Sequence, residues 1–303
     1  MKKSERIVSR QMSFKESLPY YTLIAPFLIL FIVFTVIPVI ASVILSFFNF
    51  DMINKIQFTG FDNYIRLLLD DQIFLTTVKN TLVFAVVTGP IGFLLSFVLA
   101  WFINEFHPMI RTILSFMFYC PSLVGNAYFI WQVAFSSDSY GYVNSVLLSL
   151  GLIQQPIYWL SNPQYVMPII IVVQLWQSMG VSFLANISGL QNVNGELYEA
   201  GAIDGIRNRW QELWYITLPM MQHMLLFSAV MQIASAFSVS AIAVQLAGYP
   251  SVNYCVDTIV SYLSDVGTIR YEMGYASAMS VVLFAIMAIS RWIIGKAINS
   301  VGK

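Results

Sequence analysis

The side chains of this 303-residue sequence that are suited to binding a solute are uncharged, and they lie in long apolar windows. Amides and hydroxyls occur there beside aromatic rings. Such groups can exchange hydrogen bonds with a neutral, polyhydroxylated solute, while the flat apolar faces of a sugar can lie against the rings. The residues that we expect to line a solute pathway are Asn126, Trp131, Gln174, Trp176, Ser178, Ser182, Gln232 and Ser235.

The same polar residues have a second interpretation. Ser, Asn and Gln often form hydrogen bonds between neighbouring membrane helices. Gln174, Ser178 and Ser182 recur every four residues, so they share one face of a helix whichever interpretation holds. The sequence leaves open whether that face meets a solute or another helix.

Motifs for catalysis and for nucleotide binding are absent from the sequence. It contains no G-x-x-x-x-G-K-[ST] stretch for holding phosphates, and no HExxH or GxSxG motif. The cysteines, Cys120 and Cys255, are 135 positions apart, and neither His107 nor His223 stands at a metal-ligand spacing from them. We therefore expect no catalytic residue, no metal site and no bound cofactor in this chain.

The composition indicates a membrane protein. Hydrophobic residues make up 58% of the chain and charged residues 10%, too few to cover a soluble domain of this size. A helix needs about 20 mostly apolar residues to cross a bilayer. We expect an all-α, polytopic membrane protein in which residues 18–303 form a single transmembrane domain with six spans. The windows, whose cores carry no Asp, Glu, Lys or Arg, are about 18–48, 81–103, 112–135, 165–185, 223–247 and 276–294.

Basic residues predict the orientation of these spans. Eleven of them fall on the side that holds both termini, including the polar tail 1–17, and four fall on the other side. Since cytoplasmic segments are enriched in Lys and Arg, both termini are expected to be cytoplasmic. The outer connections 49–80, 136–164 and 248–275 are long enough to hold short helices. The eleven are Lys2, Lys3, Arg6, Arg10, Lys15, Arg111, Arg207, Arg209, Arg291, Lys296 and Lys303; the four are Lys55, Arg66, Lys79 and Arg270.

One cytoplasmic connection, 194–219, has the pattern of two short helices. Asn194 is suited to cap the first, which has small residues at Ala200, Gly201 and Ala202. Gly205 is expected to end it in the left-handed conformation. Apolar residues then recur at helical spacing opposite charged ones, which is typical of a helix lying along a membrane interface; they are Ile206, Trp210, Leu213 and Trp214.

This loop resembles a known motif. Glu199, Ala200 and Gly205, followed by Ile216, Leu218 and Pro219, look like the EAA loop of the membrane subunits of bacterial ATP-binding-cassette (ABC) importers. Two departures are Gly201 in place of the third alanine and a spacer of ten residues between Gly205 and Ile216. The resemblance implies that this coupling loop (194–219) contacts an ATPase subunit. The contacting residues would be Glu199, Ala200, Gly201, Ile203, Asp204 and Gly205.

Further stretches resemble the carbohydrate-uptake branch of these permeases, related to the maltose and glycerol-phosphate permeases. The long first span, with Pro26 and Pro38, is similar to the first of two paired permeases, whereas 247–271 departs from the family pattern. The stretches are Phe61 to Tyr64, Lys79 to Leu82, Tyr140 to Asn144, Glu196 to Tyr198 and Gly274 to Ala278.

The resemblance implies a type I importer fold and a multi-pass subunit of a bacterial cell membrane. Its partners would be a second homologous permease, two cytoplasmic ATPase subunits that bind ATP and Mg²⁺, an extracytoplasmic solute-binding protein, membrane lipid, and a sugar or oligosaccharide. No nucleic acid is implied.

Two other functions remain open from the sequence: a membrane scaffold or sensor that recruits a cytoplasmic partner, and a secondary carrier. The apolar windows lack the acidic groups that proton relays use, which disfavours the carrier.

Overall fold

The computed structural model describes residues 14–301, and the side chains of 21–296. The chain is mostly helical, which confirms the all-α prediction; its strands in the described part are the short antiparallel pair β1 (Phe48–Asn49) and β2 (Gln57–Phe58). Residues 1–13, most of the predicted tail, lie outside the described residues. The helices in the first half are α1 (Phe14–Phe31), η1 (Ile32–Val36), α2 (Ile37–Leu45), α3 (Asp62–Ile65), η2 (Arg66–Asp70), α4 (Gln72–Asn104), α5 (Pro108–Leu123), α6 (Phe129–Ala134) and α7 (Tyr142–Ser149).

The second half of the chain, like the first, contains both long and short helices. Its helices are α8 (Pro163–Gln177), α9 (Val181–Gln191), α10 (Gly195–Ile203), α11 (Arg209–Glu212), η3 (Leu213–Thr217), α12 (Leu218–Met220), α13 (Gln222–Phe237), α14 (Ser240–Ala247), η4 (Val252–Tyr254), α15 (Ile259–Ser264), η5 (Asp265–Ile269) and α16 (Met273–Val301). The three outer connections hold α3, α7 and α15, as their lengths predict.

Four helical segments in the described part are long and apolar enough to cross a membrane: 21–45, 72–104, 222–247 and 273–296. The pair α8 and α9 makes a fifth if it is one span, although it is bent by 42°. The remaining predicted window, 112–135, is not one continuous helix. The count of six spans therefore stays a prediction.

The break in the third window follows from its sequence. Pro121 lacks the N–H that would continue the helical bonding, and α5 ends two residues later. Val124 is then extended, with φ −89° and ψ 100°. The bend between α8 and α9 lies beside this break. Gly180, at the bend, is so close to Ser122 that a side chain at Gly180 would collide with it. Two interrupted helices thus meet where each one is irregular.

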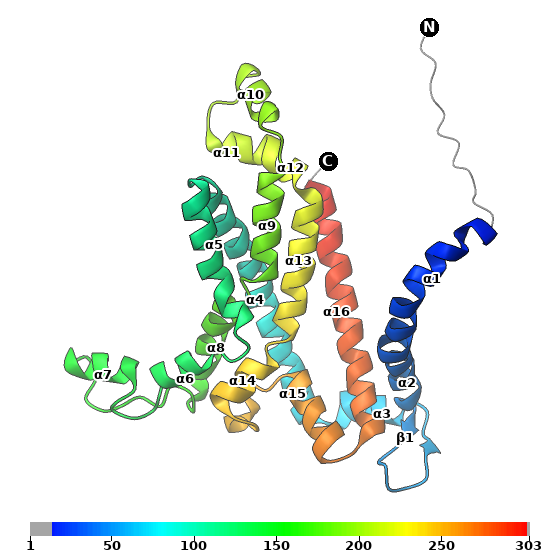
Figure 1. Ribbon diagram of the computed structural model, residues 1–303. Coiled ribbons are helices and arrows are strands. Elements are labelled where there is room, and N and C mark those ends of the chain that lie inside the picture. The colour runs from blue at the N-terminus through cyan, green and yellow to red at the C-terminus, as the bar shows by residue number, and fades with distance from the viewer. Residues whose placement is uncertain (1–13, 302–303) are drawn as a thin grey trace.

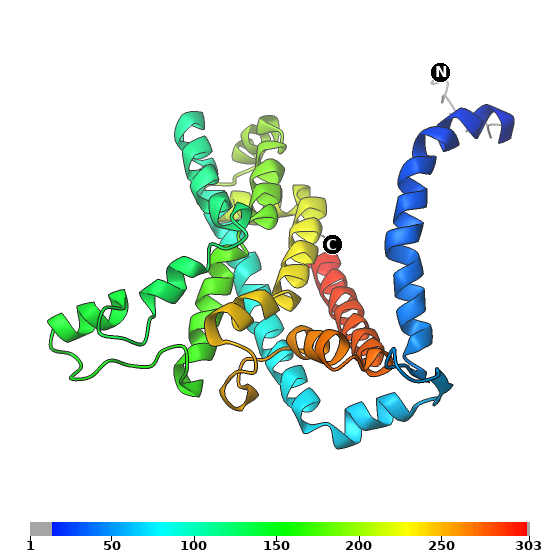
Figure 2. The same ribbon diagram turned by 60° about the horizontal axis from the view of Figure 1, so that its bottom comes forward.

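The centre of the bundle is formed by α4, α9 and α13, with α16 packed on α13 (Figure 1). At one end, Phe97, Phe183 and Leu213 belong to a core that joins α4 and α9 to the coupling loop. The helix α1 stands apart from the bundle, whereas α2, further along the same helical segment, packs against α16 (Figures 1 and 2). None of the side chains in the most apolar window of the segment 21–45 is buried. The three outer connections lie at the end of the bundle opposite α10 (Figure 1).

Asp71 ties the outer ends of three helices together. Its carboxylate caps α4 by accepting from the N–H of Phe74 at 2.8 Å, and it also accepts from the hydroxyls of Tyr262 and Tyr275, each at 2.7 Å. Arg66 lies 4.0 Å from the centre of the Tyr275 ring. Burial by itself would raise the pKa of Asp71, but the hydrogen bonds from Tyr275, Phe74 and Tyr262 outweigh burial and hold the pKa below its usual value.

We expect Asp71→Asn to lower the free energy of unfolding by about 1–3 kcal/mol at pH 7, because the buried hydroxyls lose a charged acceptor. A carboxyl whose pKa is lowered by folding contributes stability above its unfolded pKa, and this contribution is lost as the pH falls through the folded pKa. The difference between variant and wild type should therefore shrink below about pH 4. Thermal unfolding at pH 7 and pH 3.5 measures it. Asp70→Asn, at an exposed neighbour, is the control and should change neither curve.

Candidate functional site

The first helix of the coupling loop begins and ends where the sequence predicts. The Asn194 side chain accepts from the N–H of Glu196 at 3.1 Å, which caps α10. The helix stops at Ile203, and Gly205 has a φ of +97°, in the left-handed region that glycine favours. The α10 tip, which we define as Glu199, Ala200, Ile203 and Asp204, is exposed, and the Ile203 side chain is 88% exposed.

Gly201 does not belong to this exposed surface. It is buried, and a methyl group at its Cα would lie 2.7 Å from Cδ1 of Ile216 and 3.0 Å from Cδ1 of Ile206. The missing side chain thus lets α10 lie close against η3 of the same chain. The close approach at Gly201 is therefore within the chain, and the expected contact of Gly201 with an ATPase subunit stays a prediction.

The second half of the loop differs from a single interfacial helix. It runs as α11, the π-helical η3 and α12, joined end to end. Leu213 is buried in the core, whereas Trp210 is 69% and Trp214 64% exposed, so the four apolar residues predicted for one face do not share one environment. Ile206 precedes the start of α11, and Leu213 and Trp214, as neighbours in sequence, point about 100° apart around the helix axis.

Several contacts join the coupling loop to the bundle. Arg209 forms ion pairs with Glu105, beyond the end of α4, at 2.7 Å and with Glu212 at 3.1 Å. The rings of Trp101 and Trp210 are 5.2 Å apart. Behind these contacts lies a cavity of about 220 Å³. No sequence pattern points to the Glu105 and Arg209 pair, because the two residues are 104 positions apart.

Tyr198 adds an internal contact between the two halves of the loop. Its hydroxyl and that of Thr217 are 2.9 Å apart, so α10 is bonded to η3 as well as packed on it.

The expected pathway residues form two groups. A cavity of about 190 Å³, which we call the polar cavity, is lined in part by Gln174, Ser178 and Ser235. Gln174 donates to the carbonyl and hydroxyl of Ser235 at 2.9 and 3.1 Å, so these two residues also join α8 to α13. The two interpretations of the polar residues thus apply to the same side chains.

Gln232 and Ser182 belong to the packing between helices. Both are 2% exposed. Gln232 donates to the carbonyl of Ser178 at 3.4 Å, and it lies against Gly92, where a methyl group would be 3.1 Å from its Nε2 atom. Neither residue lines the polar cavity. These contacts favour the helix-joining interpretation for this pair.

The aromatic members lie close to one another. The rings of Trp131 and Trp176 are 5.6 Å apart in an edge-to-face arrangement, and Nε1 of Trp131 is buried without a hydrogen-bond partner. Asn126 is exposed and accepts from the hydroxyl of Tyr128 at 2.8 Å. Tyr128 itself lines the polar cavity. Asn126 therefore does not line the polar cavity itself, but it is hydrogen-bonded to Tyr128, which does.

Gln177 is a residue of this site that the sequence prediction left out. It lines the polar cavity, and its Oε1 atom is buried without a hydrogen-bond partner. Its spacing of three residues from Gln174 on one helix was an available signal. In the described part of the chain, no group of three His, Cys, Asp or Glu side chains is placed to hold a metal ion.

Comparisons with known proteins agree with this architecture. The probable ABC transporter permease protein YesP of Bacillus subtilis (strain 168) is 32% identical over 288 residues, which cover 93% of this chain and 91% of YesP. The arabinooligosaccharides transport system permease protein AraP of the same organism is 29% identical, over 92% of this chain and 88% of AraP. The lactose transport system permease protein LacF of Rhizobium radiobacter is 31% identical, over 68% of each chain. No family model matches the chain.

Among solved structures, the fold matches a chain of a bacterial ABC transporter involved in the import of the acidic polysaccharide alginate. The TM-score is 0.78 at 24% sequence identity, and the match covers 95% of this chain and 98% of the other. This likeness confirms the fold expected from the coupling loop. With YesP 32% identical over nearly the whole length, the chain belongs to the permease family of ABC transporters.

Proposed function

We propose that this permease subunit carries a neutral sugar or oligosaccharide that an extracytoplasmic binding protein delivers. The observation that supports this proposal most directly is the lining of the polar cavity, which combines amides, hydroxyls and the Tyr128 ring and contains no charged side chain. A cavity of this chemistry suits hydroxyl groups better than carboxylates. The names of AraP and LacF, which specify arabinooligosaccharides and lactose, support a sugar as the solute.

As a permease, the chain is not itself an enzyme. Its proposed partners are a second homologous permease and two ATPase subunits that bind ATP and Mg²⁺. The α10 tip would enter a cleft of one ATPase, and closure of the ATPase pair on ATP would move the coupling loop. The contacts of Tyr198 and Arg209 would pass this movement to α13 and α4. The two permeases would then change from inward-facing to outward-facing.

The proposed orientation puts the coupling loop and both termini in the cytoplasm. The start of α1 and the end of α16 lie toward the end of the molecule that carries α10, which supports this orientation (Figure 1). It also supports an even number of spans, as in the proposed six, because an even number of crossings returns the chain to the side where it began. The ends of those spans, about 18–48, 81–103, 112–135, 165–185, 223–247 and 276–294, are part of the proposal.

Reconstitution tests the proposed function. The permease, its partner permease and the ATPase subunits would be placed in vesicles with the purified binding protein and a radiolabelled oligosaccharide. We expect uptake that requires ATP and the binding protein together. Uptake driven by an ion gradient without ATP would contradict the proposal, and recovery of the ATPase without a second permease would favour a scaffold instead.

Gln177 is predicted to contact the solute. We expect Gln177→Ala to lower uptake at low sugar concentration about tenfold, because one hydrogen bond to the solute of about 1.4 kcal/mol is lost. Uptake rates across a range of sugar concentrations measure the effect. Gln132→Ala, at an exposed position on α6, is the matched control and should leave uptake unchanged. Equal uptake by the two variants would show that Gln177 does not contact the solute.

Gln232 and Trp176 provide the comparison between solute contact and packing. Gln232→Ala should reduce uptake together with thermal stability, because its contacts are with helices α4 and α8. Trp176→Ala should reduce uptake without affecting the binding of the ATPase subunits.

A further inference from the structure

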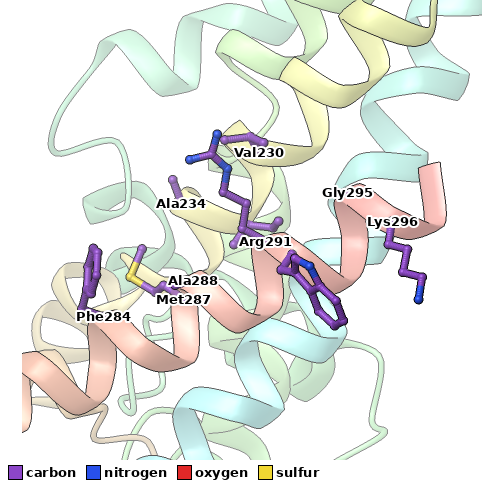
Figure 3. Close-up of a pocket in the computed structure, with 10 residues that line it drawn as sticks. Val230, Ala234, Phe284, Met287, Ala288, Arg291, Gly295 and Lys296 are labelled. Carbon is purple, nitrogen blue, oxygen red and sulfur yellow. The ribbon is translucent and has the colours of Figure 1, made fainter. Parts of the chain in front are cut away.

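Asp257 is the one charged residue that is buried among the side chains that the structure describes. It is 1% exposed, whereas the other charged side chains of 21–296 are at least partly exposed. Arg291 and Lys296, for example, are exposed beside an apolar groove of about 900 Å³ between α13 and α16 (Figure 3). An ionised carboxylate that is buried without a counter-ion costs free energy, so the groups around Asp257 decide whether it carries a charge.

No cation among the described residues forms an ion pair with this carboxylate. Its Oδ2 atom accepts from the N–H of Ser251 at 3.0 Å. Arg270, just after η5, is paired with Asp265 at 2.6 Å. α14 contains no titratable residue, and Lys79 of α4 is exposed. Because Asp257 is enclosed by its own chain, a partner subunit cannot reach the carboxylate while these segments stay packed.

Asp257 lies in a loop, residues 249–258, that we call the outer loop. It joins α14 to α15 at the end of the molecule opposite α10 (Figure 1). The side-chain amide of Asn80, on α4, donates to the carbonyl of Tyr254 at 2.8 Å and to that of Asp257 at 3.0 Å. Within the loop, the hydroxyl of Ser251 accepts from the N–H of Val256 at 3.3 Å. These bonds hold the outer loop against α4 and enclose the carboxylate.

The backbone of the outer loop is strained. Asn253 and Tyr254 each have a φ of +54°, in the left-handed region that residues other than glycine seldom adopt. Such conformations persist where surrounding contacts hold them. The strained backbone and a charged Asp257 both favour opening of the loop, whereas the bonds of Asn80 favour closure. The charge on Asp257 can therefore shift the balance between a closed and an open loop.

Burial raises the pKa of Asp257, and the hydrogen bonds from Ser251 offset only part of this effect. The closed loop thus binds a proton more tightly than an open loop, in which the pKa would be about 4. The proton stabilises the closed loop fully below that value, and this contribution is lost as the pH rises through the higher pKa of the closed loop. Burial also raises the pKa of Tyr249 and of Cys255, so these two neighbours stay neutral where Asp257 titrates.

We propose that Asp257 is a proton-binding site that controls the outer loop. With the proton bound, the neutral carboxyl stays buried and the loop stays closed on α4. When the proton passes to water, the carboxylate favours an open loop in which it is hydrated.

The outer loop is linked to the polar cavity by packing. Val256 belongs to the same apolar core as Tyr128 and Ile242, and both of these residues line the cavity. Opening of the loop would withdraw Val256 from this core and loosen the outer wall of the cavity. The inference rests on the proposed function for the outward position of the loop and for the role of the cavity. Loss of the proton should therefore make the solute site more accessible from the outer side.

Hydrogen exchange of the whole complex in nanodiscs tests the site, without sugar, binding protein or ATP. Exchange of peptides from 249–258 would be measured from pH 4 to pH 8 and corrected for the intrinsic pH dependence of amide exchange, so that it reports the open fraction of the loop. We expect this fraction to rise at least about threefold in the wild type, because linkage allows up to about tenfold for each pH unit. Asp257→Asn cannot ionise and should keep the low-pH value throughout.

Two further variants complete the test. Asp62→Asn changes an exposed aspartate of another outer connection and should retain the wild-type rise. Asn80→Ala removes the bonds to α4 and should raise the open fraction at every pH. A constant open fraction in the wild type, the same rise in Asp257→Asn, or no effect of Asn80→Ala would each overturn the proposal. Because no measurement involves sugar uptake, failure of the proton site is distinguishable from failure of the proposed transport function.

Discussion

Ile203→Asp is expected to weaken the binding of the ATPase to the permease by about 10- to 100-fold. Ile203 is 88% exposed at the end of α10, where a buried partner surface would gain about 1.5–3 kcal/mol from covering it. Aspartate would lose this gain and add a charge that must be desolvated. Titration of purified ATPase against the permease pair in nanodiscs measures the affinity.

The control for this experiment is Ile53→Asp. Ile53 is 85% exposed in an outer connection, so the two substitutions change the same chemistry at opposite ends of the molecule. The control should bind the ATPase like the wild type. If Ile203→Asp also binds normally, α10 does not hold the ATPase through its tip.

Gly205→Leu is expected to leave the complex assembled and to abolish most stimulation of ATP hydrolysis by the binding protein. Nothing lies within 4 Å of a side chain placed at Gly205, so the effect comes from its φ of +97°, which costs other residues about 1–3 kcal/mol. The turn would relax and change the angle between α10 and η3. ATPase activity with and without the loaded binding protein is the measurement.

Gly151→Leu is the matched control for the backbone effect. Gly151 also has a positive φ, +68°, and open space around it, but it follows α7 in an outer connection. The control should retain stimulation. Normal stimulation and uptake in Gly205→Leu would contradict a role for the α10 turn in coupling.

The coupling loop was predictable where its structure depends on local chemistry. Asn194 caps α10 because its side chain reaches an N–H two residues away, and Gly205 ends the helix because of its own φ. The inward position of Gly201 was not predictable, since it depends on Ile206 and Ile216 after the turn. A small residue at that position fits an external or an internal contact equally well.

The solute site was predictable in its chemistry but not in its geometry. Amides and hydroxyls in apolar windows indicated either solute contacts or helix contacts, and the pairing of Gln174 with Ser235, 61 positions away, depends on how α8 crosses α13. The window 112–135 was predicted as one span because it carries no charged residue, and hydropathy does not report backbone continuity. Pro121 and Gly125 were the local signals.

In the proposed function, the 42° bend between α8 and α9 would set the direction in which a movement of the coupling loop reaches the polar cavity. α9 leads directly to α10, whereas α8 carries part of the polar cavity, and the two halves meet at Ser178 to Gly180. If α8 and α9 formed one straight helix, an axial displacement of α9 would pass along the axis of α8 without a change of direction. With the bend, an axial displacement of α9 would have a sideways component at α8 and would tilt the part of the polar cavity that α8 lines.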